Sequence, residues 1–318
     1  MVSYEKNLAE FGKQLSFKNL ADFRLKKPAK TKPDGIVICG IGGSGIPGMI
    51  IKSFSEELGL PVPIVIVKDK KIPRLYLKNP FFIAVSFSGK TAETLACLKQ
   101  ALALKSKSGV AVVTSGGKLK SFADKRGLPL VTFRAKNLTP REASGIMVHG
   151  IVKVLKAIFP QIKTSPLKGF EPLRLKSFGE QLARKAKDRN ILIYTDHSFA
   201  HLGYIWKTNL NETAKIPAFT NTYPELNHNE IAGFEKAKGA WAIFWLMEKS
   251  SAILKNKIRI ISKIIGNRTK SFEISLEGQN MQEKTWNGVI LSQWISLYLA
   301  KINKVDPRKT KIIDRLKK

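Results

Sequence analysis

The sequence has little cysteine. Only Cys39 and Cys97 occur among its 318 residues, and both stand between apolar neighbours. A disulfide framework or a cysteine-rich zinc site needs more cysteines than this. We therefore expect two buried, reduced thiols. The chain has 43% hydrophobic residues, enough for a core, and its length predicts two domains.

Acidic residues are also scarce. The chain has 24 Asp and Glu against 55 Lys and Arg, which gives a formal net charge of +31. Such a surface attracts anions over a long range. The basic residues are spread along the whole chain, without a compact basic arm or interleaved aromatic residues, so we predict a solvated basic surface and no specific nucleic-acid binding. A small phosphorylated substrate fits the same sign of charge.

Long apolar runs are missing as well. The stretch 36–51 is broken by glycines and is too short to span a bilayer, and the first eleven residues carry charges without an apolar signal core. These absences predict a cytoplasmic protein with no membrane partner.

Short runs rich in β-branched residues alternate with helical patterns in the first half of the chain. This alternation predicts an α/β fold with a parallel sheet covered by helices on both faces. The expected strands are Gly35–Cys39, Pro63–Val67, Phe81–Ser86, Val110–Thr114 and Pro129–Phe133. The expected helices are Gly45–Leu58, Ala92–Lys105, Lys118–Lys125 and Pro140–Ile158.

The second half repeats the alternation, so we expect two copies of one three-layer architecture. The expected helices there are Glu171–Lys187, Ser198–Ala214, Ser250–Ile261 and Asn280–Lys301. The expected strands are Asn190–Tyr194, Ala218–Thr220, Ala240–Trp245 and Ser271–Ser275. The predicted domains are 1–158 with an N-terminal helical extension, a connection over 159–170 rich in Pro, Gly and Lys, and 171–318 with a C-terminal tail.

Two polar loops follow expected strands of the first half, where open parallel sheets bind ligands. The first, 39–45, matches G-x-G-x-x-G through Gly40, Gly42 and Gly45. A dinucleotide site also needs an acidic residue at the end of the next strand, and Asp69 comes late and between lysines. We favour a backbone cradle for another anionic or polyhydroxylated ligand, with a tight strand-to-helix turn as the alternative.

The second loop, 84–91, resembles a relaxed Walker A sequence, but Ala84 replaces its first glycine and the loop proper is too short to wrap a β-phosphate. Instead, Ser86, Ser88 and Thr91 place three hydroxyls before a helix N-terminus, which suits one phosphate monoester. Capping of that helix by Ser88 or Thr91 is the alternative, although capping needs one hydroxyl only.

Four strings together resemble a family. Gly42-Gly43-Ser44 and Ser86-Phe87-Ser88-Gly89-Lys90-Thr91 look like the sugar isomerase (SIS) domain. With Thr139-Pro140-Arg141-Glu142-Ala143, Asn211-Glu212-Thr213-Ala214-Lys215 and Pro224-Glu225-Leu226-Asn227-His228-Asn229-Glu230, they are similar to the bifunctional phosphoglucose/phosphomannose isomerases of archaea and bacteria. The resemblance extends from about Gly35 to Lys317, and the string 224–230 is its most specific part.

The resemblance implies two SIS subdomains and a homodimer whose site lies between subdomains at the subunit interface. It implies reversible conversion of glucose 6-phosphate or mannose 6-phosphate to fructose 6-phosphate through a cis-enediol, with no cofactor and no metal. By motif, Ser86, Ser88 and Thr91 would bind the phosphate, Gly43 and Ser44 would line the sugar, and Thr310 would lie near it. The catalytic set would be Arg141, Glu212, His228 and Lys317, with His228 acting on the neighbouring subunit's site.

The chemistry suits these residue types. A carboxylate such as Glu212, expected at the mouth of the second sheet, can move a proton between C2 and C1. A histidine can open the sugar ring near neutral pH, and Asn227 and Asn229 could fix the tautomer of His228. Arg141, at an expected helix start, can stabilise the negative charge of an enediolate. The alternatives are a surface Glu212, a loop-capping His228 and a surface Arg141.

Two further alternatives concern the whole protein. His197 and His201 are four residues apart, as in some metal sites, but they lack an intervening glutamate and an obvious third ligand. A non-catalytic SIS protein that senses a sugar phosphate would keep the three hydroxyls of the second loop. It would not need Glu212, His228 and Lys317 together, so the full set favours an enzyme.

The phosphate loop departs from the family pattern at two positions. Phe87 and Lys90 stand where tyrosine and asparagine are usual, and Lys90 adds a cation near the expected phosphate. The segment after Pro307 is unusually basic, which leaves the relative activity toward the two hexose phosphates open.

Overall fold

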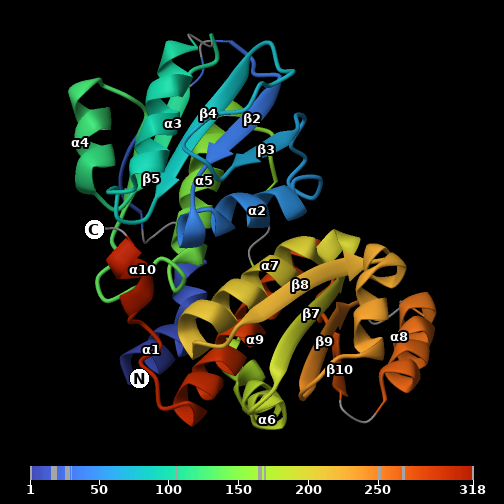
Figure 1. Ribbon diagram of the computed structural model, residues 1–318. Helices are drawn as coiled ribbons and strands as arrows, with labels where there is room; N and C mark the ends of the chain where they lie inside the picture. The colour runs from blue at the N-terminus through green and yellow to red at the C-terminus, as the bar shows by residue number, and fades with distance from the viewer. Residues whose placement is uncertain are drawn as a thin grey trace. The chain divides into compact units, whose positions relative to one another are not determined.

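The computed structural model describes residues 2–15, 20–25, 29, 31–104, 107–163, 167, 170–248, 252–266 and 269–316. Contacts divide the chain into two compact units. The N-terminal unit is Glu10–Phe170, and the C-terminal unit combines Met1–Ala9 with Glu171–Lys318. Both units are α/β, with parallel strands flanked by helices, as predicted (Figure 1).

The described part of the N-terminal unit holds a six-stranded sheet in the order β1-β6-β5-β4-β2-β3. Strands β2 to β6 run parallel, and β1 pairs antiparallel with β6 at the edge. The strands are β1 Leu20–Arg24, β2 Gly35–Cys39, β3 Ile64–Val67, β4 Pro80–Ser86, β5 Val110–Thr114 and β6 Leu130–Phe133. The helices are α2 Ile46–Ser53, α3 Ala92–Ala103, α4 Gly117–Lys125 and α5 Ser144–Ile158, with 3₁₀ turns at Phe11–Gln14 and Gly42–Ser44.

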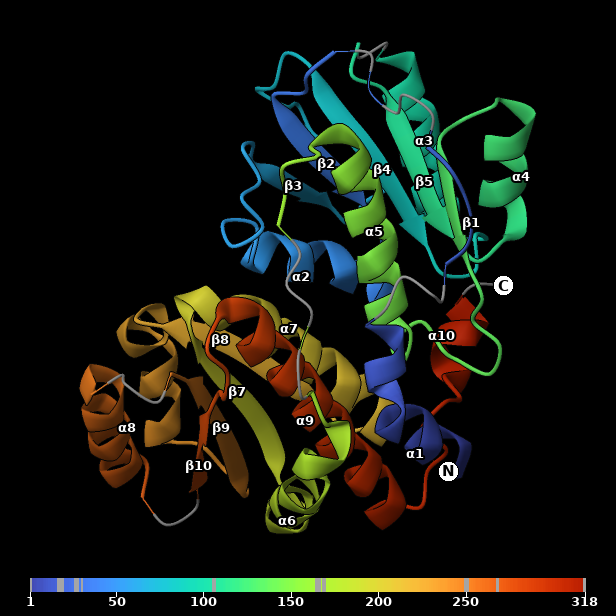
Figure 2. The same cartoon turned by 180° about the vertical axis from the view of Figure 1, so that it is seen from behind.

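Helices cover both faces of this sheet. Helices α3 and α4 lie on one face, and α2 and α5 lie on the other (Figures 1 and 2). Every residue of β2 and β4 is therefore buried, which explains why these strands appear in the sequence as nearly continuous apolar runs. Cys39 and Cys97 lie in the core cluster under α3 and are free, so the prediction of buried reduced thiols is confirmed.

The described part of the C-terminal unit holds a four-stranded parallel sheet in the order β10-β9-β7-β8. The strands are β7 Asn190–Asp196, β8 Ala218–Tyr223, β9 Trp241–Met247 and β10 Thr269–Ser275. The α-helices are α1 Val2–Ala9, α6 Lys176–Ala186, α7 Ala200–Asn209, α8 Ala252–Ile265, α9 Met281–Ile302 and α10 Lys311–Leu316. Shorter turns are η4 Pro172–Leu175, η5 His197–Phe199, the π-helix η6 Leu210–Ala214, η7 Glu225–His228 and η8 Glu230–Glu235.

This second sheet is also covered on both faces. On one face, α8 and η7 bury Leu254 and Leu226 with the strand residues in one cluster. On the other, the α7 side chain of Trp206 packs 5.5 Å from the ring of Phe244, and its Nε1 donates to the carbonyl of Gly288 in α9. The packing fixes α7, whose continuation carries one of the predicted catalytic residues.

The N-terminal helix differs from its predicted place. We expected residues 1–158 to form one subdomain, but contacts group α1 with the C-terminal unit. The carboxylate of Glu5 lies 2.9 Å from Lys176 Nζ and 2.6 Å from Lys301 Nζ. Because those lysines are remote in sequence, local patterning contained no sign of this attachment.

Two other features were not anticipated. The edge strand β1 is mostly exposed and carries no apolar run, so no sequence pattern predicted a strand there. The long helix expected over 198–214 is instead η5, α7 and the π-helix η6. Of the predicted connection, residues 164–166, 168 and 169 lie outside the described residues. In the described parts of the chain, no helix is both long and apolar enough to cross a membrane.

Candidate active site

Two loops of the N-terminal unit meet at the point where its strand order reverses. Strands β2 and β4 are neighbours, with β3 beyond β2 and β5 beyond β4. The chain leaves both strands at the same edge, into the glycine loop 40–45 and the hydroxyl loop 87–91. Ligands of open parallel sheets bind in the crevice outside such a reversal. The two loops predicted from sequence are therefore brought together.

A hydroxyl network shapes the second loop. Ser86 is fully buried, and its Oγ accepts a hydrogen bond from the Gly89 N–H at 3.1 Å and lies 2.9 Å from Thr91 Oγ1. Ser88 is exposed, and its Oγ accepts from the Lys90 N–H at 3.2 Å. Ser86 thus braces the turn from within, while Ser88 stands at its surface.

The expected capping alternative is not what the structure shows. Thr91 occupies the N-cap position of α3, but its side chain makes no capping hydrogen bond. Its hydroxyl is next to Ser86 Oγ, and the Ser88 hydroxyl is bonded within the loop. The first-turn N–H groups of α3 therefore have no side-chain cap, an arrangement that favours an anion at this helix N-terminus.

Glycine is required where the two loops turn. Gly89 has a φ of +63°, and a Cβ there would lie 1.7 Å from the carbonyl oxygen of Gly116. A Cβ on Gly43 would lie 2.7 Å from Pro140 Cβ. Ser44 links the loops, since its Oγ accepts from the Phe87 N–H at 2.9 Å. A larger residue would therefore clash with Pro140 at position 43 and with the Gly116 backbone at position 89.

Arg141 lies beside the glycine loop rather than on a helix. It sits in the turn before α5, which begins at Ser144, and only 5% of its surface is exposed. The Thr139 N–H donates to Glu142 Oε2 at 3.0 Å, and Gln14 Nε2 donates to the Glu142 carbonyl at 2.7 Å. These bonds hold the turn, so the alternative of a surface arginine is wrong.

In the C-terminal unit, Glu212 lies in the π-helix η6 that continues α7. Lys215 ends this turn with a left-handed backbone, φ +60°, and its Nζ donates to the Glu212 carbonyl. Asn211 Oδ1 accepts from the Ala218 N–H at 2.8 Å, and Asn303 Nδ2 donates to the Ala214 carbonyl at 3.2 Å. Single π-helical turns occur frequently at functional sites, because the widened turn displaces a side chain from its α-helical position.

Glu212 lies near the amino ends of the strands of the second sheet, whereas we expected it near their carboxyl ends. Helix α7 begins beyond the carboxyl end of β7 and runs back, so its π-helical continuation reaches the amino end of β8, where Asn211 bonds Ala218. The prediction that Glu212 stands at the mouth of this sheet was wrong for that reason.

His228 lies beyond the other end of β8. It ends the turn η7, is exposed, and follows the last residue of β8, Tyr223, by five positions. The rise per strand residue makes β8 about 17 Å long. Within one chain, Glu212 and His228 therefore stand near opposite ends of this strand. Asn229 donates its amide to Glu225 Oε1 at 2.8 Å, so that amide is directed at a carboxylate rather than at the histidine.

The C-terminal tail leaves α9 beside the π-helix η6, because Asn303, the C-cap of α9, bonds Ala214. Thr310 is half-buried, its carbonyl accepts from the Asp314 N–H at 2.9 Å, and α10 follows it directly. Lys317, the predicted C-terminal catalytic lysine, lies outside the described residues.

Comparison with known proteins identifies the family. The chain is 28% identical over 288 residues to the bifunctional phosphoglucose/phosphomannose isomerase of Aquifex aeolicus, covering 89% of each chain. It is 30% identical over 287 residues to the protein of that name from Thermoplasma acidophilum, covering 89% of this chain and 88% of the relative. The chain belongs to the bifunctional phosphoglucose/phosphomannose isomerase family. As a member of this family, the protein is an isomerase.

Other matches agree with membership of this isomerase family. Residues 175–318 match the family described as bacterial phospho-glucose isomerase C-terminal SIS domain. A D-glucosamine-6-phosphate 4-epimerase of Sulfolobus acidocaldarius is 30% identical over 228 residues, 67% of this chain and 68% of the relative. The fold is that of the C-terminal domain of glucosamine-fructose-6-phosphate aminotransferase from Francisella tularensis, with a TM-score of 0.72, 16% identity and coverage of 96% and 98%.

Two of the remaining histidines have partners inside their own unit. His201 is buried, and its Nε2 lies 3.0 Å from Thr285 Oγ1. Burial lowers the pKa of His201 to about 4, and a hydrogen bond to the Ser198 backbone opposes that shift. His149 Nδ1 lies 3.0 Å from the Gly145 carbonyl within α5, and burial lowers its pKa. Among the described residues, no group of three or more His, Cys, Asp or Glu could hold a metal ion.

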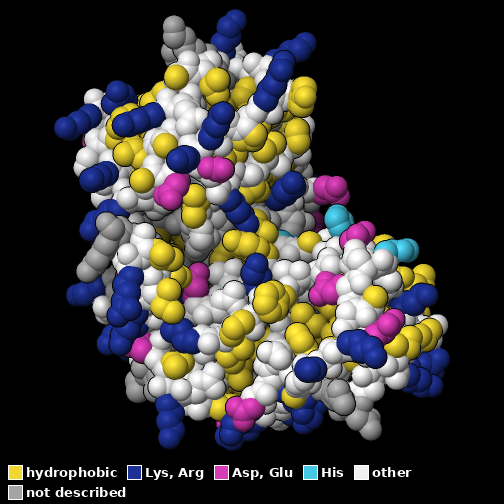
Figure 3. Space-filling model, viewed as in Figure 1, with side chains coloured by type: hydrophobic (Ala, Val, Ile, Leu, Met, Phe, Trp, Pro, Cys, Tyr) yellow, Lys and Arg dark blue, Asp and Glu magenta, His cyan; other side chains and the backbone are white. Residues whose placement is uncertain are grey.

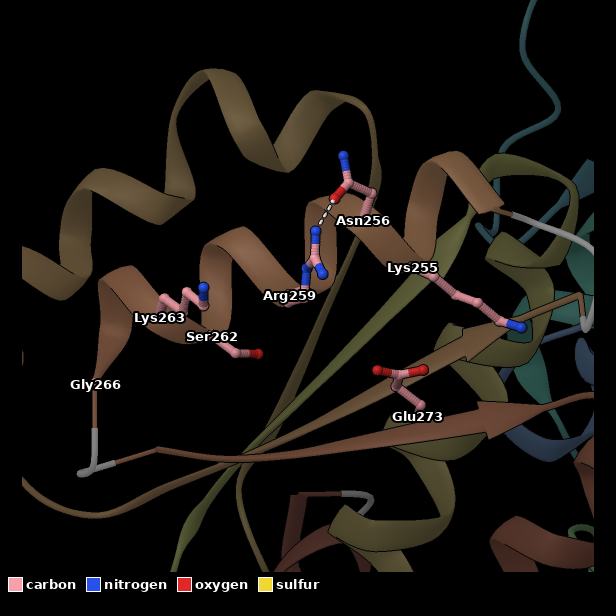
Figure 4. A pocket seen from close by; sticks show the side chains of 7 residues that line it. All are labelled: Lys255, Asn256, Arg259, Ser262, Lys263, Gly266 and Glu273. Carbon is pink, nitrogen blue, oxygen red and sulfur yellow. Dashed lines mark hydrogen bonds between the residues drawn. The ribbon is translucent and has the colours of Figure 1, made fainter.

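A surface cavity lies away from these residues, in the C-terminal unit. A cavity of about 780 Å³ between α8 and β10 is open to solvent (Figure 4). Its lining consists of Lys255, Asn256, Arg259, Ser262, Lys263, Gly266 and Glu273. It contains none of the predicted site residues, and its basic side chains belong to the general excess of positive charge, which is visible in the space-filling view (Figure 3).

The sequence analysis did not single out several residues that hold the segments carrying Glu212 and His228. Tyr194 and Asn221 both donate hydrogen bonds to the carboxylate of Glu230. Asn303 donates to the Ala214 carbonyl of the π-helix, and Asn211 within the π-helix accepts from the Ala218 N–H of β8. Glu230 could have been singled out, since it is the last residue of the most specific string, but Asn303 stands in no motif.

Proposed function

We propose that this protein interconverts glucose 6-phosphate, and mannose 6-phosphate, with fructose 6-phosphate through a cis-enediol intermediate and without a metal. The observation that carries the proposal is the hydroxyl loop beside an uncapped helix N-terminus at the strand reversal, in a member of this isomerase family. The loop offers Ser88 and Thr91 hydroxyls and backbone N–H groups to a dianionic monoester.

The reaction begins by opening the sugar ring. His228 would transfer a proton between the anomeric hydroxyl and the ring oxygen, assisted by the cation of Lys317. His228 suits this work because it is exposed at the end of a turn, where a substrate can reach it.

Isomerisation then moves one hydrogen between neighbouring carbons. Glu212 would remove the C2 proton of the open aldose, giving the enediolate, and would return it to C1 while the oxygen proton passes from O2 to O1. The guanidinium of Arg141 would stabilise the negative charge that develops on the oxygens. Rotation about C2–C3 in the open chain would let one base serve both C2 epimers.

The position of His228 supports a homodimer. Glu212 and His228 of one chain stand near opposite ends of β8, a strand about 17 Å long, and a separation of that order is too large for both to act on adjacent atoms of one sugar. A partner related by a two-fold axis would bring its own His228 to this chain's Glu212, so each site would be shared between two copies.

A coupled assay with each hexose phosphate tests the function. We expect conversion of both glucose 6-phosphate and mannose 6-phosphate to fructose 6-phosphate, with no loss of activity after treatment with a chelator. A protein that binds fructose 6-phosphate without converting it would instead be the non-catalytic sensor. C4 epimerisation of glucosamine 6-phosphate, without aldose–ketose turnover, would place it with the Sulfolobus acidocaldarius relative.

A further inference from the structure

The carboxylate of Glu230 is held by both of its oxygens. The Tyr194 hydroxyl donates to Oε1 at 3.0 Å, and Asn221 Nδ2 donates to Oε2 at 2.7 Å. Tyr194 belongs to β7 and Asn221 to β8, so the two donors come from neighbouring strands of one sheet. A side chain held at two points by rigid strands fixes the backbone that carries it.

That backbone carries His228. Glu230 opens the turn η8, two residues after His228 closes η7. On the other side of the histidine, Leu226 is fully buried in the core cluster of β7 and β9. His228 is thus an exposed residue between an apolar anchor and a carboxylate anchor. The loop could not move His228 without breaking one of them.

The hydroxyl of Tyr194 is held in place and stays protonated. The residue is fully buried, and its ring stands edge-on to Trp245 with centroids 4.9 Å apart. Burial, followed by the charge of Glu230, raises the pKa of the Tyr194 hydroxyl. The hydroxyl therefore stays protonated and donating across the pH range in which a histidine titrates.

We propose that Glu230, held by Tyr194 and Asn221, is a positioning residue for His228. By fixing the backbone next to His228, it would determine how close this histidine comes to the bound sugar. This inference rests on the proposed role of His228 in ring opening. Glu230 itself touches no reacting atom, since its two oxygens face β7 and β8.

Kinetics of Glu230→Gln test the inference. The amide replaces one acceptor oxygen with a donor, which would face the donors Tyr194 or Asn221. We expect kcat for glucose 6-phosphate to fall about 10- to 100-fold, because a displacement of about 1 Å can cost a factor of 100, while KM changes less than about threefold. Glu235→Gln, an exposed glutamate at the end of the same turn, is the matched control and should leave kcat unchanged.

A double-mutant cycle separates positioning from general damage. If Glu230 acts through the histidine, Glu230→Gln should cost nothing further in a His228→Ala background. Tyr194→Phe, which keeps the ring and loses one donor, serves if Glu230→Gln fails to fold, and should lower kcat about 3- to 10-fold with the same non-additivity.

The outcomes are distinct. Full turnover of Glu230→Gln, or an equal further loss in the His228→Ala background, overturns the inference while leaving the isomerase activity intact. Full turnover of His228→Ala overturns both the inference and the proposed ring-opening role. A wild-type protein without isomerase activity would contradict the proposed function itself.

Discussion

At the scale of single residues, the hydroxyls in and before the hydroxyl loop differ in burial and in hydrogen bonding. Ser86 is buried and bonded within the turn, whereas Ser88 is exposed and Thr91 is half-buried. The sequence indicated three hydroxyls before a helix, and only the structure separates the one that braces the turn from the two that can face a ligand.

This difference predicts the effect of Ser88→Ala combined with Thr91→Ala. Losing two hydrogen bonds to a charged group, each contributing about 1.5 kcal/mol or more, should raise KM for the hexose phosphates at least about tenfold. Steady-state kinetics measure the change, with Ser121→Ala on the exposed face of α4 as the control. An unaltered KM would place the phosphate elsewhere.

His201 predicts a dependence of stability on pH. Burial lowers its pKa from 6.5 to about 4, so the unfolded chain binds a proton in that interval that the folded chain does not. The stabilisation is complete above pH 6.5 and declines as pH falls toward 4, by about 3 kcal/mol in total. Urea unfolding at pH 7 and pH 5 measures it.

The substitution His201→Gln should flatten that dependence, while His197→Gln, at an exposed position, should not. Equal slopes for wild type and His201→Gln would show that this histidine does not carry the effect.

At the scale of elements, the π-helix that carries Glu212 is the least regular part of the site. Asn303, at the end of α9, donates to the carbonyl of Ala214, the last residue of the π-helix. The segment that carries Glu212 and the C-terminal tail are therefore held by the same hydrogen bond. The helix predicted over 198–214 is an α-helix only over Ala200–Asn209, because no residue type in the sequence marks the 3₁₀ turn before it or the π-helix after it. The hydrogen bond from Asn303 reaches the π-helix from a position remote in sequence.

Asn303→Ala should loosen this anchor. Loss of one hydrogen bond, about 1 kcal/mol, should lower Tm by about 2–4 °C. Displacement of Glu212 should also lower kcat, and by more than the loss of folded protein alone could explain. Asn256→Ala, on the exposed face of α8, is the control. A drop in Tm with wild-type kcat would mean that Asn303 only stabilises the fold.

The buried strands and the loops after them could be predicted because their signals are local. Residues 35–39 and 81–86 are continuous apolar runs, and the glycines and hydroxyls follow directly. The strand β1, the attachment of α1 and the edge at which Glu212 stands could not be predicted. Each depends on partners far along the chain or on the direction in which a helix returns.

At the scale of the whole molecule, Glu212 and His228 stand near opposite ends of β8, so the proposed chemistry would need two copies of the chain to complete one site. Mixed dimers of Glu212→Gln and His228→Ala test this sharing. Each variant alone should be nearly inactive, whereas co-expression should restore roughly a quarter of wild-type activity, because half of the dimers contain one intact site. No recovery in verified mixed dimers would mean that both residues act within one chain.

The most direct test of the whole account is Glu212→Gln, measured for both binding and turnover of fructose 6-phosphate. The account predicts binding within about threefold of wild type, because the phosphate grip lies in the N-terminal unit, and a loss of turnover of at least about a thousandfold, because the proton carrier is gone. Turnover within a few-fold of wild type would contradict it.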